Sequence, residues 1–232
     1  VSDLERKVRL ATKLGTWQST LTNIQYLRPI WRDNTAEERL LGVSLTGIMD
    51  NELLSGRDAV YGKNFGWALG QMKGHAIRVN QEIAAELGIP SSTAVTCVKP
   101  SGTVSLLTDT ASGIHARHNN MYIRTVRADN KDPLTQFMKD QGIVNEPCTN
   151  NPDKTTIFSF PIKAPLNCVT RNDMTAIEQL EMWLMYAQYW CEHKPSVTIT
   201  VCDHEWMDVG AWVYKHFDVC SGISFLPHSD HT

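Results

Sequence analysis

A short run of small polar residues at positions 99–105 is the part of the sequence best suited to bind an anion. It reads Lys-Pro-Ser-Gly-Thr-Val-Ser and directly follows a run of β-forming residues at 93–98. A strand that gives way to a helix at Pro-Ser-Gly-Thr leaves backbone N–H groups unbonded at the helix start, where hydroxyl groups and the helix dipole favour negative charge. The run therefore predicts a phosphate-binding loop whose candidate ligands are Ser101, Gly102, Thr103, Val104 and Ser105.

The same residues also fit an ordinary helix cap. Ser101 or Thr103 could bond the first turn of its own helix, and Gly102 could serve only a tight turn. The run does not have the glycine and lysine spacing of a P-loop. Taken alone, these seven residues leave both interpretations open.

A second polar run lies at 112–118 and reads Ser-Gly-Ile-His-Ala-Arg-His. Its two histidines, His115 and His118, have no third ligand at a metal-binding spacing, so we predict no metal site and expect them to make structural hydrogen bonds. The guanidinium group of Arg117 is suited to phosphate recognition. We therefore take Arg117 as a candidate contact to a phosphate or nucleotide.

Two further groups of residues suggest chemistry but have simpler explanations. Aromatic residues at helical intervals resemble a base-stacking stripe, yet this spacing on an apolar helix favours core packing. They are Trp183, Tyr186, Tyr189 and Trp190. Asp50 and Asp109 are expected to be cap or turn residues.

The segments that must position these residues alternate between helix and strand patterns. Apolar residues at helical spacing predict helices at 4–14, 64–87, 132–141, 172–191 and 203–216, with another starting at Ser101. Apolar or β-branched runs predict a strand with its exit turn at 40–49, and strands at 93–98, 121–126, 156–161, 196–201 and 222–225. Residues 34–38 are expected to form a turn, and 145–153 a long loop. This order is typical of the α/β class, with a parallel or mixed sheet covered by helices.

The composition of the chain limits its partners. Its 232 residues are 42% hydrophobic and 20% charged, with a net charge of −3, which gives no general attraction to nucleic acid or to an acidic membrane. There is no apolar run long enough for a membrane span and no signal peptide pattern, so cytoplasmic localisation is expected.

The six cysteines are scattered and include no Cys-x-x-Cys pair. This spacing argues against a zinc ribbon, a thioredoxin-type site or a disulfide framework. We expect most of them to be small buried residues. They are Cys97, Cys148, Cys168, Cys191, Cys202 and Cys220.

Taken in order, the motifs resemble those of the adenosylcobalamin-dependent (class II) ribonucleotide reductases, in particular the monomeric ribonucleoside-triphosphate reductase branch. The resemblance spans most of the chain. The motifs that carry it lie at 41–50, 99–107, 112–118, 122–127, 189–200 and 222–232.

The resemblance implies a radical enzyme that reduces ribonucleoside triphosphates to 2′-deoxyribonucleoside triphosphates for DNA synthesis. Adenosylcobalamin would be its cofactor, and thioredoxin or a similar dithiol would be its reductant. In such an enzyme residues 101–105 hold the substrate phosphates. The radical cysteine and the catalytic carboxylate of the family lie in an Asn-x-Cys-x-Glu loop that does not occur in this sequence. The catalytic residues are therefore expected before Val1.

The resemblance also implies a fold, namely a ten-stranded α/β barrel built from two half-barrels. Residues 1–232 would be the C-terminal portion of this single catalytic domain and would supply roughly its second half-barrel. A half-barrel exposes a sheet edge and part of an apolar lumen. We therefore expect the chain to be poorly stable by itself.

Two alternatives differ in their predictions. A diiron-dependent ribonucleoside-diphosphate reductase large subunit would carry a tyrosine pair after the last barrel strand, but residues 224–228 read Ser-Phe-Leu-Pro-His. A non-catalytic α/β nucleotide-binding module would use the same phosphate loop in an independently folded domain. The absence of tyrosine disfavours the first alternative, and the second remains open.

Overall fold

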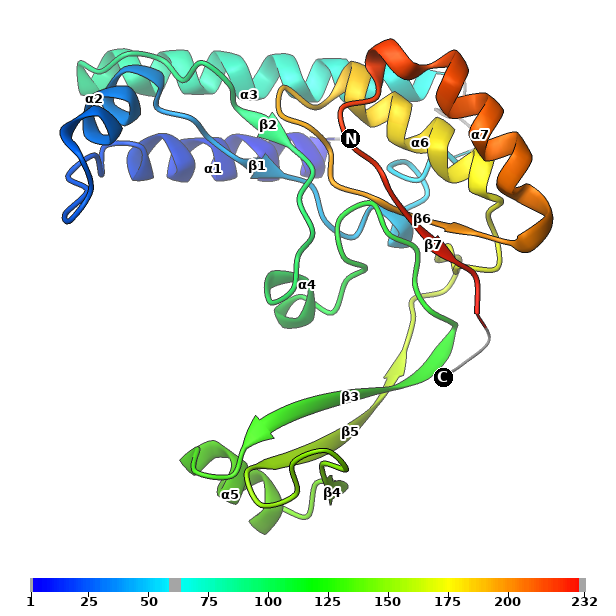
Figure 1. Ribbon diagram of the computed structural model, residues 1–232. Coiled ribbons are helices and arrows are strands. Elements are labelled where there is room, and N and C mark those ends of the chain that lie inside the picture. The colour runs from blue at the N-terminus through cyan, green and yellow to red at the C-terminus, as the bar shows by residue number, and fades with distance from the viewer. Residues whose placement is uncertain (1, 59–63, 230–232) are drawn as a thin grey trace.

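The computed structural model describes residues 2–58 and 64–229 (Figure 1). The last three residues of the 222–232 motif, including His231, lie outside this range. The helices are α1 (Ser2–Gln18), α2 (Pro29–Glu38), α3 (Phe65–Leu87), α4 (Val104–Leu107), α5 (Pro133–Asp140), α6 (Ala176–Tyr189) and α7 (Trp206–Lys215). The strands are β1 (Val43–Ser44), β2 (Thr96–Cys97), β3 (Met121–Asp129), β4 (Asn145–Pro147), β5 (Thr155–Lys163), β6 (Thr198–Val201) and β7 (Ser224–Pro227). Short 3-10 helices are η1 (Ile48–Asp50), η3 (Asp203–Glu205) and η4 (Phe217–Val219).

The described strands form three small sheets rather than the single sheet that the sequence predicts. β1 pairs with β2 and β6 pairs with β7, both in parallel, while β3, β5 and β4 form an antiparallel sheet. The alternation of helix and strand thus correctly indicates a mixed α/β chain with parallel pairs. The alternation does not indicate that the strands predicted at 121–126 and 156–161 belong to a separate antiparallel unit.

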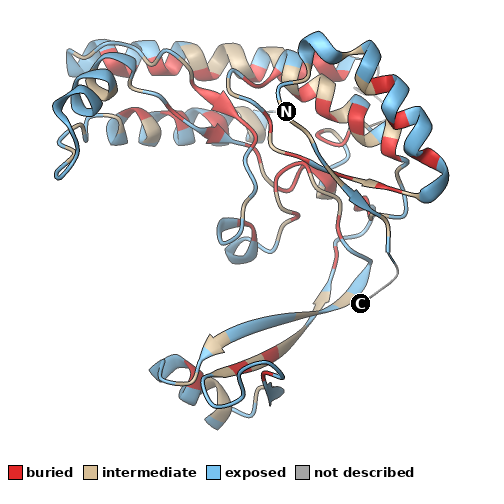
Figure 2. Ribbon diagram, viewed as in Figure 1, coloured by how far each residue is buried: buried red, intermediate tan, exposed pale blue. Residues whose placement is uncertain are grey.

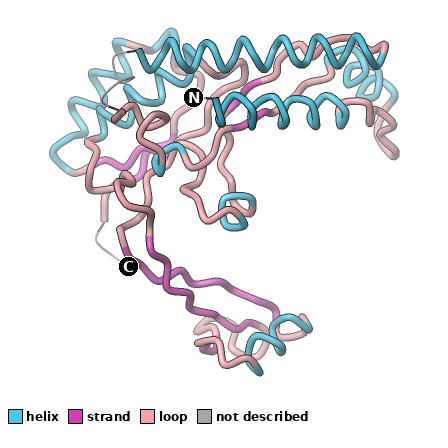
Figure 3. The backbone as a smooth tube through the Cα atoms, turned by 180° about the vertical axis from the view of Figure 1, so that it is seen from behind, coloured by secondary structure: helices cyan, strands magenta, loops and turns pink. Residues whose placement is uncertain are grey.

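This antiparallel unit, which we call the arm, consists of β3, α5, β4 and β5 (residues 121–163). It projects from the rest of the chain, the body, as a long two-stranded ribbon (Figures 1 and 3). β3 and β5 pair along their whole lengths, from Met121 opposite Lys163 to Asp129 opposite Thr155. Part of the loop predicted at 145–153 is in fact strand β4, because residues 145–147 extend the arm sheet along β5.

The hydrophobic core lies in the body, between α3, α6 and the parallel strands (Figure 2). Ile48, Leu69 and Ile199 are fully buried there, as are the rings of Trp183 and Trp190. Fully burying a large apolar side chain stabilises a fold by about 1.5–3 kcal/mol. The core therefore fixes the orientation of the parallel strands and of the loops that follow them.

The four aromatic residues in and directly after α6 confirm the prediction of core packing at three positions. Trp183 and Trp190 donate from Nε1 to the carbonyl oxygens of Pro195 and Cys97, at 3.1 and 2.8 Å. The Tyr186 hydroxyl donates to the Leu54 carbonyl at 2.8 Å. Tyr189 is 42% exposed, so the prediction was wrong for this ring.

The other differences from the predicted elements have local causes. The expected turn at 34–38 is the end of α2, which starts at Pro29, a favoured first residue of a helix. The strand and exit turn predicted at 40–49 are present, but the strand is only β1, and Gly47, with a φ of 69°, directs the chain into η1. The helix predicted from Ser101 is only the four-residue α4.

No helix among the described residues is long and apolar enough to cross a membrane. All six cysteines are free thiols. Four of them are buried, which agrees with the expectation that most are small buried residues.

Candidate functional site

The candidate phosphate loop, residues 99–105, leaves the carboxyl end of β2. In sheets of parallel strands this is the end at which ligands bind. The first residue of the loop is held to the neighbouring strand, because the backbone N–H of Lys99 donates to Ser44 Oγ at 3.0 Å. The loop therefore starts from a fixed point beside the end of β1.

Two of the predicted ligands, Ser101 and Ser105, use their hydroxyl groups inside the loop. Ser101 Oγ accepts a hydrogen bond from the Ser105 N–H at 2.8 Å, and the Ser105 hydroxyl donates to the Ser101 carbonyl. The N–H of Ser101 is bound in turn by Ser112 Oγ, at 2.9 Å. These side chains hold the shape of the loop.

The three residues between them face outward. Gly102, Thr103 and Val104 are exposed, and their backbone N–H groups donate no hydrogen bond to any other described residue. A Cβ atom placed on Gly102 would meet no atom within 4 Å, and its φ lies outside the left-handed range. Neither packing nor backbone conformation therefore requires a glycine at this position.

These three residues border a cavity of about 810 Å³. Its other walls come from the second half of α1, the end of α2 and the outer side of β1. Arg39 and Lys99 contribute cationic side chains, and no aspartate or glutamate lines the cavity. Arg39 donates from Nη1 to the Ser19 carbonyl at 2.7 Å, while its buried Nε has no partner among the described residues. The cavity is thus positively charged and within the size range of small-molecule sites.

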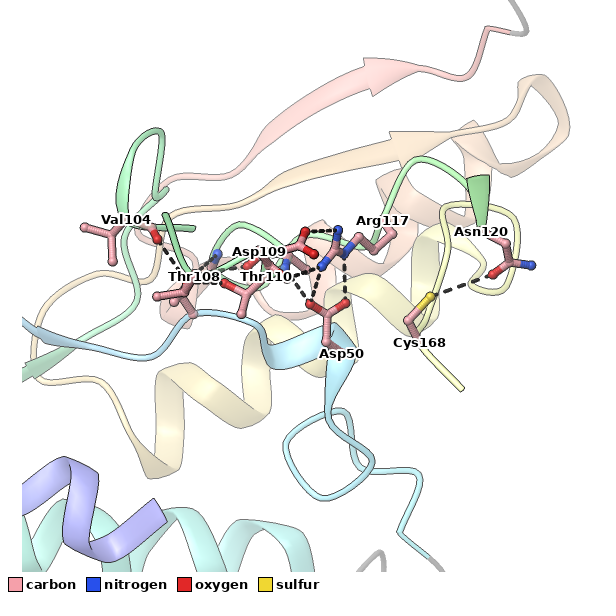
Figure 4. Close-up of polar contacts among 11 residues, drawn as sticks. Asp50, Val104, Thr108, Asp109, Thr110, Arg117, Asn120 and Cys168 are labelled. Carbon is pink, nitrogen blue, oxygen red and sulfur yellow. Dashed lines mark hydrogen bonds and ion pairs between the residues drawn. The ribbon is translucent and has the colours of Figure 1, made fainter. Parts of the chain in front are cut away.

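Arg117, the predicted nucleotide contact, lies in a buried ion pair instead of on a surface (Figure 4). Its side chain is 3% exposed, and the partner carboxylate of Asp50 is 9% exposed. Nε donates to Asp50 Oδ1 at 3.0 Å and Nη2 donates to Oδ2 at 2.9 Å. These hydrogen bonds to the Asp50 carboxylate raise the pKa of Arg117 above its already high ordinary value. Direct contact between Arg117 and a nucleotide remains an untested prediction.

The segment after α4 is fastened to the end of β1. Thr46 Oγ1 donates to the Ala111 carbonyl and accepts from the Gly113 N–H, both at 3.0 Å. Gly113 has a φ of 54°, and a Cβ there would lie 2.8 Å from the Lys99 carbonyl oxygen. Only glycine fits between this segment and the start of the phosphate loop.

His115 makes structural hydrogen bonds, as predicted. Its Nδ1 lies 3.0 Å from the Ser112 carbonyl, and its Nε2 accepts from the Thr198 N–H at 3.0 Å, which joins the 112–118 segment to β6. His118 packs edge-on against Tyr122. No group of three or more potential metal ligands occurs among the described residues.

The cysteines near the phosphate loop are poor nucleophiles. Burial raises the pKa of Cys97, and burial together with the nearby Cys97 thiol raises the pKa of Cys191 to about 12. A thiol with such a pKa is protonated at neutral pH. Neither residue has the properties of a catalytic thiolate.

Sequence reasoning missed the residues that hold the phosphate loop in place. Ser44 binds the first N–H of the loop, Thr46 binds the segment after the loop, and Ser112 binds the Ser101 N–H. Asp50, which binds Arg117, was expected only to be a cap or turn residue. All four lie within motifs at 41–50 and 112–118, and that position was the available signal. Their partners are far away in sequence, so the spacing could not reveal them.

Comparison with known proteins gives consistent results, although no family model matches the chain. The adenosylcobalamin-dependent ribonucleoside-triphosphate reductase of Euglena gracilis is 35% identical over 148 residues, which cover 63% of this chain and 20% of that protein. The enzyme of the same name from Lactobacillus leichmannii is 26% identical over 250 residues, covering 97% of this chain and 33% of that protein.

A crystal structure of a B12-dependent (class II) ribonucleotide reductase has a similar fold. The TM-score is 0.83 at 25% sequence identity, and the match covers 99% of this chain and 35% of that one. The chain thus spans between one fifth and about one third of the length of these relatives. Over nearly its whole length, the chain is a homologue of the adenosylcobalamin-dependent (class II) ribonucleotide reductases.

Proposed function

We propose that this chain is the part of an adenosylcobalamin-dependent ribonucleoside-triphosphate reductase that holds the substrate phosphates and forms the second half of the barrel wall. The observation that carries the proposal is the row of exposed residues 102–104, whose N–H groups have no hydrogen-bond partner among the described residues, beside a cavity that has two cations and no carboxylate. Homology to enzymes named for this reaction supports the identity of the substrate.

The phosphate oxygens would accept hydrogen bonds from the N–H groups of Gly102, Thr103 and Val104 and from the Thr103 hydroxyl. Each such bond to a charged group contributes about 1.5–3 kcal/mol. Ser101 and Ser105 would act indirectly, by keeping the loop in shape. Lys99 and Arg39 would offset the negative charge of the bound group from the cavity wall.

The loop would contribute to catalysis by positioning the substrate. Fixing the phosphates fixes the ribose to which they are attached, and such orientation can supply a large part of a rate enhancement. When bound, adenosylcobalamin supplies the radical chemistry that starts reduction at the 2′ carbon. The electrons would come from thioredoxin or a similar dithiol. The absence of an Asn-x-Cys-x-Glu loop means that no cysteine of this chain is assigned to the radical step.

The residues described here do not by themselves fit the cofactor. The cavity beside the phosphate loop, of about 810 Å³, suits a nucleotide-sized ligand, whereas a corrinoid is much larger. We therefore assign no residue of this chain to cobalamin and derive no step through it.

The Gly102→Ala substitution tests the phosphate assignment in the full enzyme that contains this chain. The fold has room for the added methyl group, but a phosphate lying close to the backbone would collide with it. We expect the KM for the ribonucleoside triphosphate to rise on the order of 10-fold or more, as for the loss of one charge-assisted contact. The assay is deoxynucleotide formation with adenosylcobalamin and a dithiol.

Gly210→Ala is the matched control, because a Cβ on Gly210 in α7 also meets no atom within 4 Å. It should leave KM unchanged. An unaltered KM in Gly102→Ala would remove the phosphate assignment, while turnover that requires a diiron subunit in place of adenosylcobalamin would reject the class II reaction. These two results are independent of each other.

A further inference from the structure

The ion pair between Arg117 and Asp50 is unusually well enclosed. The two residues come from segments 67 positions apart and meet through two parallel hydrogen bonds of 3.0 and 2.9 Å. Arg117 is the only arginine or lysine among the described residues classed as buried. Its surroundings leave its guanidinium group no surface for a ligand, since the side chain is 3% exposed.

The two side chains also form hydrogen bonds with backbone groups of the turn at residues 109–111. Asp50 Oδ2 accepts a hydrogen bond from the Ala111 N–H at 2.6 Å, and Arg117 Nη2 donates to the Asp109 carbonyl at 2.7 Å. Asp109 has a left-handed backbone, with a φ of 48°. The backbone groups of Asp109 and Ala111 are thus each hydrogen-bonded to one member of the pair, and Figure 4 shows Asp109 beside Asp50 and Arg117.

This turn connects directly to the phosphate loop. Ala111 is followed by Ser112, whose Oγ accepts the N–H of Ser101, the residue before the outward N–H groups. A continuous path therefore leads from Arg117 through Asp50, Ala111 and Ser112 to the start of the loop.

We propose that Arg117 and Asp50 are positioning residues, which set the direction of the phosphate-binding N–H groups without touching the substrate. This inference rests on the proposed phosphate function of the loop. An arginine with a carboxylate in two-pronged contact fixes both distance and angle, which a lysine cannot do. Binding of the phosphates is sensitive to such placement, because a displacement of about 1 Å can cost on the order of 100-fold in activity.

The test is a double-mutant cycle with Asp50→Asn, Arg117→Gln and the combined variant in the full enzyme. We expect each single variant to raise KM for the ribonucleoside triphosphate about 10-fold or more, with a smaller change in kcat. The combined variant should be no worse than the worse single one, because both changes break the same contact. Arg117→Lys should not restore KM, because it keeps the charge but loses the geometry.

Inorganic tripolyphosphate serves as a second probe, because its binding requires no turnover. Its affinity should fall in both single variants, and amide hydrogen exchange at residues 101–112 should become faster. If the enzyme proves not to be a reductase, tripolyphosphate binding and amide exchange still test the pair. If both single variants fail to fold, Arg117→Lys supplies the same measurements.

Glu205→Gln is the control for the general loss of a buried carboxylate. Glu205 is 9% exposed and accepts hydrogen bonds from the N–H groups of Ala176 and Cys202, each at 2.8 Å, away from the loop. It should lower the melting temperature and leave KM and tripolyphosphate affinity unchanged. The proposal is overturned if Asp50→Asn leaves KM and tripolyphosphate affinity unchanged while Arg117→Gln raises KM and lowers that affinity. Arg117 would then contact the ligand directly.

Discussion

Cys148 differs from the cysteines near the phosphate loop. Hydrogen bonds from the backbone N–H groups of Asn150 and Asn151, and the nearby Arg127 guanidinium, lower the pKa of its thiol. Burial has the opposite effect at Cys191, whose pKa is about 12. Because the thiolate is the reactive form, these two cysteines should respond differently to pH.

The rate of alkylation of Cys148 by iodoacetamide should rise with pH. We expect it to reach half its maximum at a pH below about 8.5, the pKa of an ordinary cysteine. A lowered pKa leaves more thiolate at a given pH, so the curve shifts to lower pH. Arg127→Gln should shift it back toward the ordinary value, and Arg124→Gln, from the same strand, should not. Mass spectrometry of the modified peptide across a pH series measures this. A midpoint that Arg127→Gln does not move would exclude a role for its charge.

At the scale of elements, α6 shows how local sequence and packing cooperate. Thr175 and Glu178 form a reciprocal capping box at its N-terminus, in which each side chain bonds the backbone of the other. The cap explains why the helix begins at Ala176 and not at the predicted 172. Below it, Trp183 and Trp190 fix the helix to the segments around the parallel strands.

Replacing Thr175 with alanine should weaken the first turn of α6 by about 1 kcal/mol, the usual effect of losing an N-cap. This corresponds to roughly fivefold faster amide exchange at the first turn. Hydrogen exchange with mass spectrometry can resolve this peptide. Thr149→Ala, at an exposed position on the arm, is the control and should change nothing in α6. Equal exchange in both variants would show that packing alone holds the helix end.

The molecule as a whole presents open edges. Among the described strands, β1 pairs only with β2, and β3 pairs only with β5, so each has an unpaired side. Exposed apolar side chains lie on or near these two strands. Leu14, beside β1, is 61% exposed, and Met121 and Ile123, on β3, are 72 and 70% exposed. Unpaired strand edges with apolar neighbours promote association.

We therefore expect the 232-residue chain by itself to self-associate and to show no reductase activity with adenosylcobalamin, dithiol and a ribonucleoside triphosphate. Size-exclusion chromatography and a deoxynucleotide assay on the purified chain test the two expectations. Deoxynucleotide formation would contradict the assignment of the catalytic residues to another part of the enzyme. A stable, monodisperse monomer would favour the alternative of an independent nucleotide-binding module.

The sequence by itself determined the elements whose causes are local. The amphipathic spacing of residues 65–87, followed by Gly88, predicts α3 to within a residue, and the β-branched runs locate β2, β6 and β7 approximately. Ordered motifs also identified the family, since the residues around Ser101 and Arg117 are recognisable in order without knowledge of their contacts.

Only the tertiary structure decided how these residues work together. It separated the hydroxyl groups of Ser101 and Ser105, which bond the loop itself, from the outward N–H groups of Gly102 to Val104. It also placed Arg117 against Asp50, 67 residues earlier, and showed that the strands of the arm form a sheet separate from the parallel strands. The physical reason is that burial and hydrogen-bond partners depend on contacts between distant segments. Periodicity records only which face of an element is apolar, and not what that face meets.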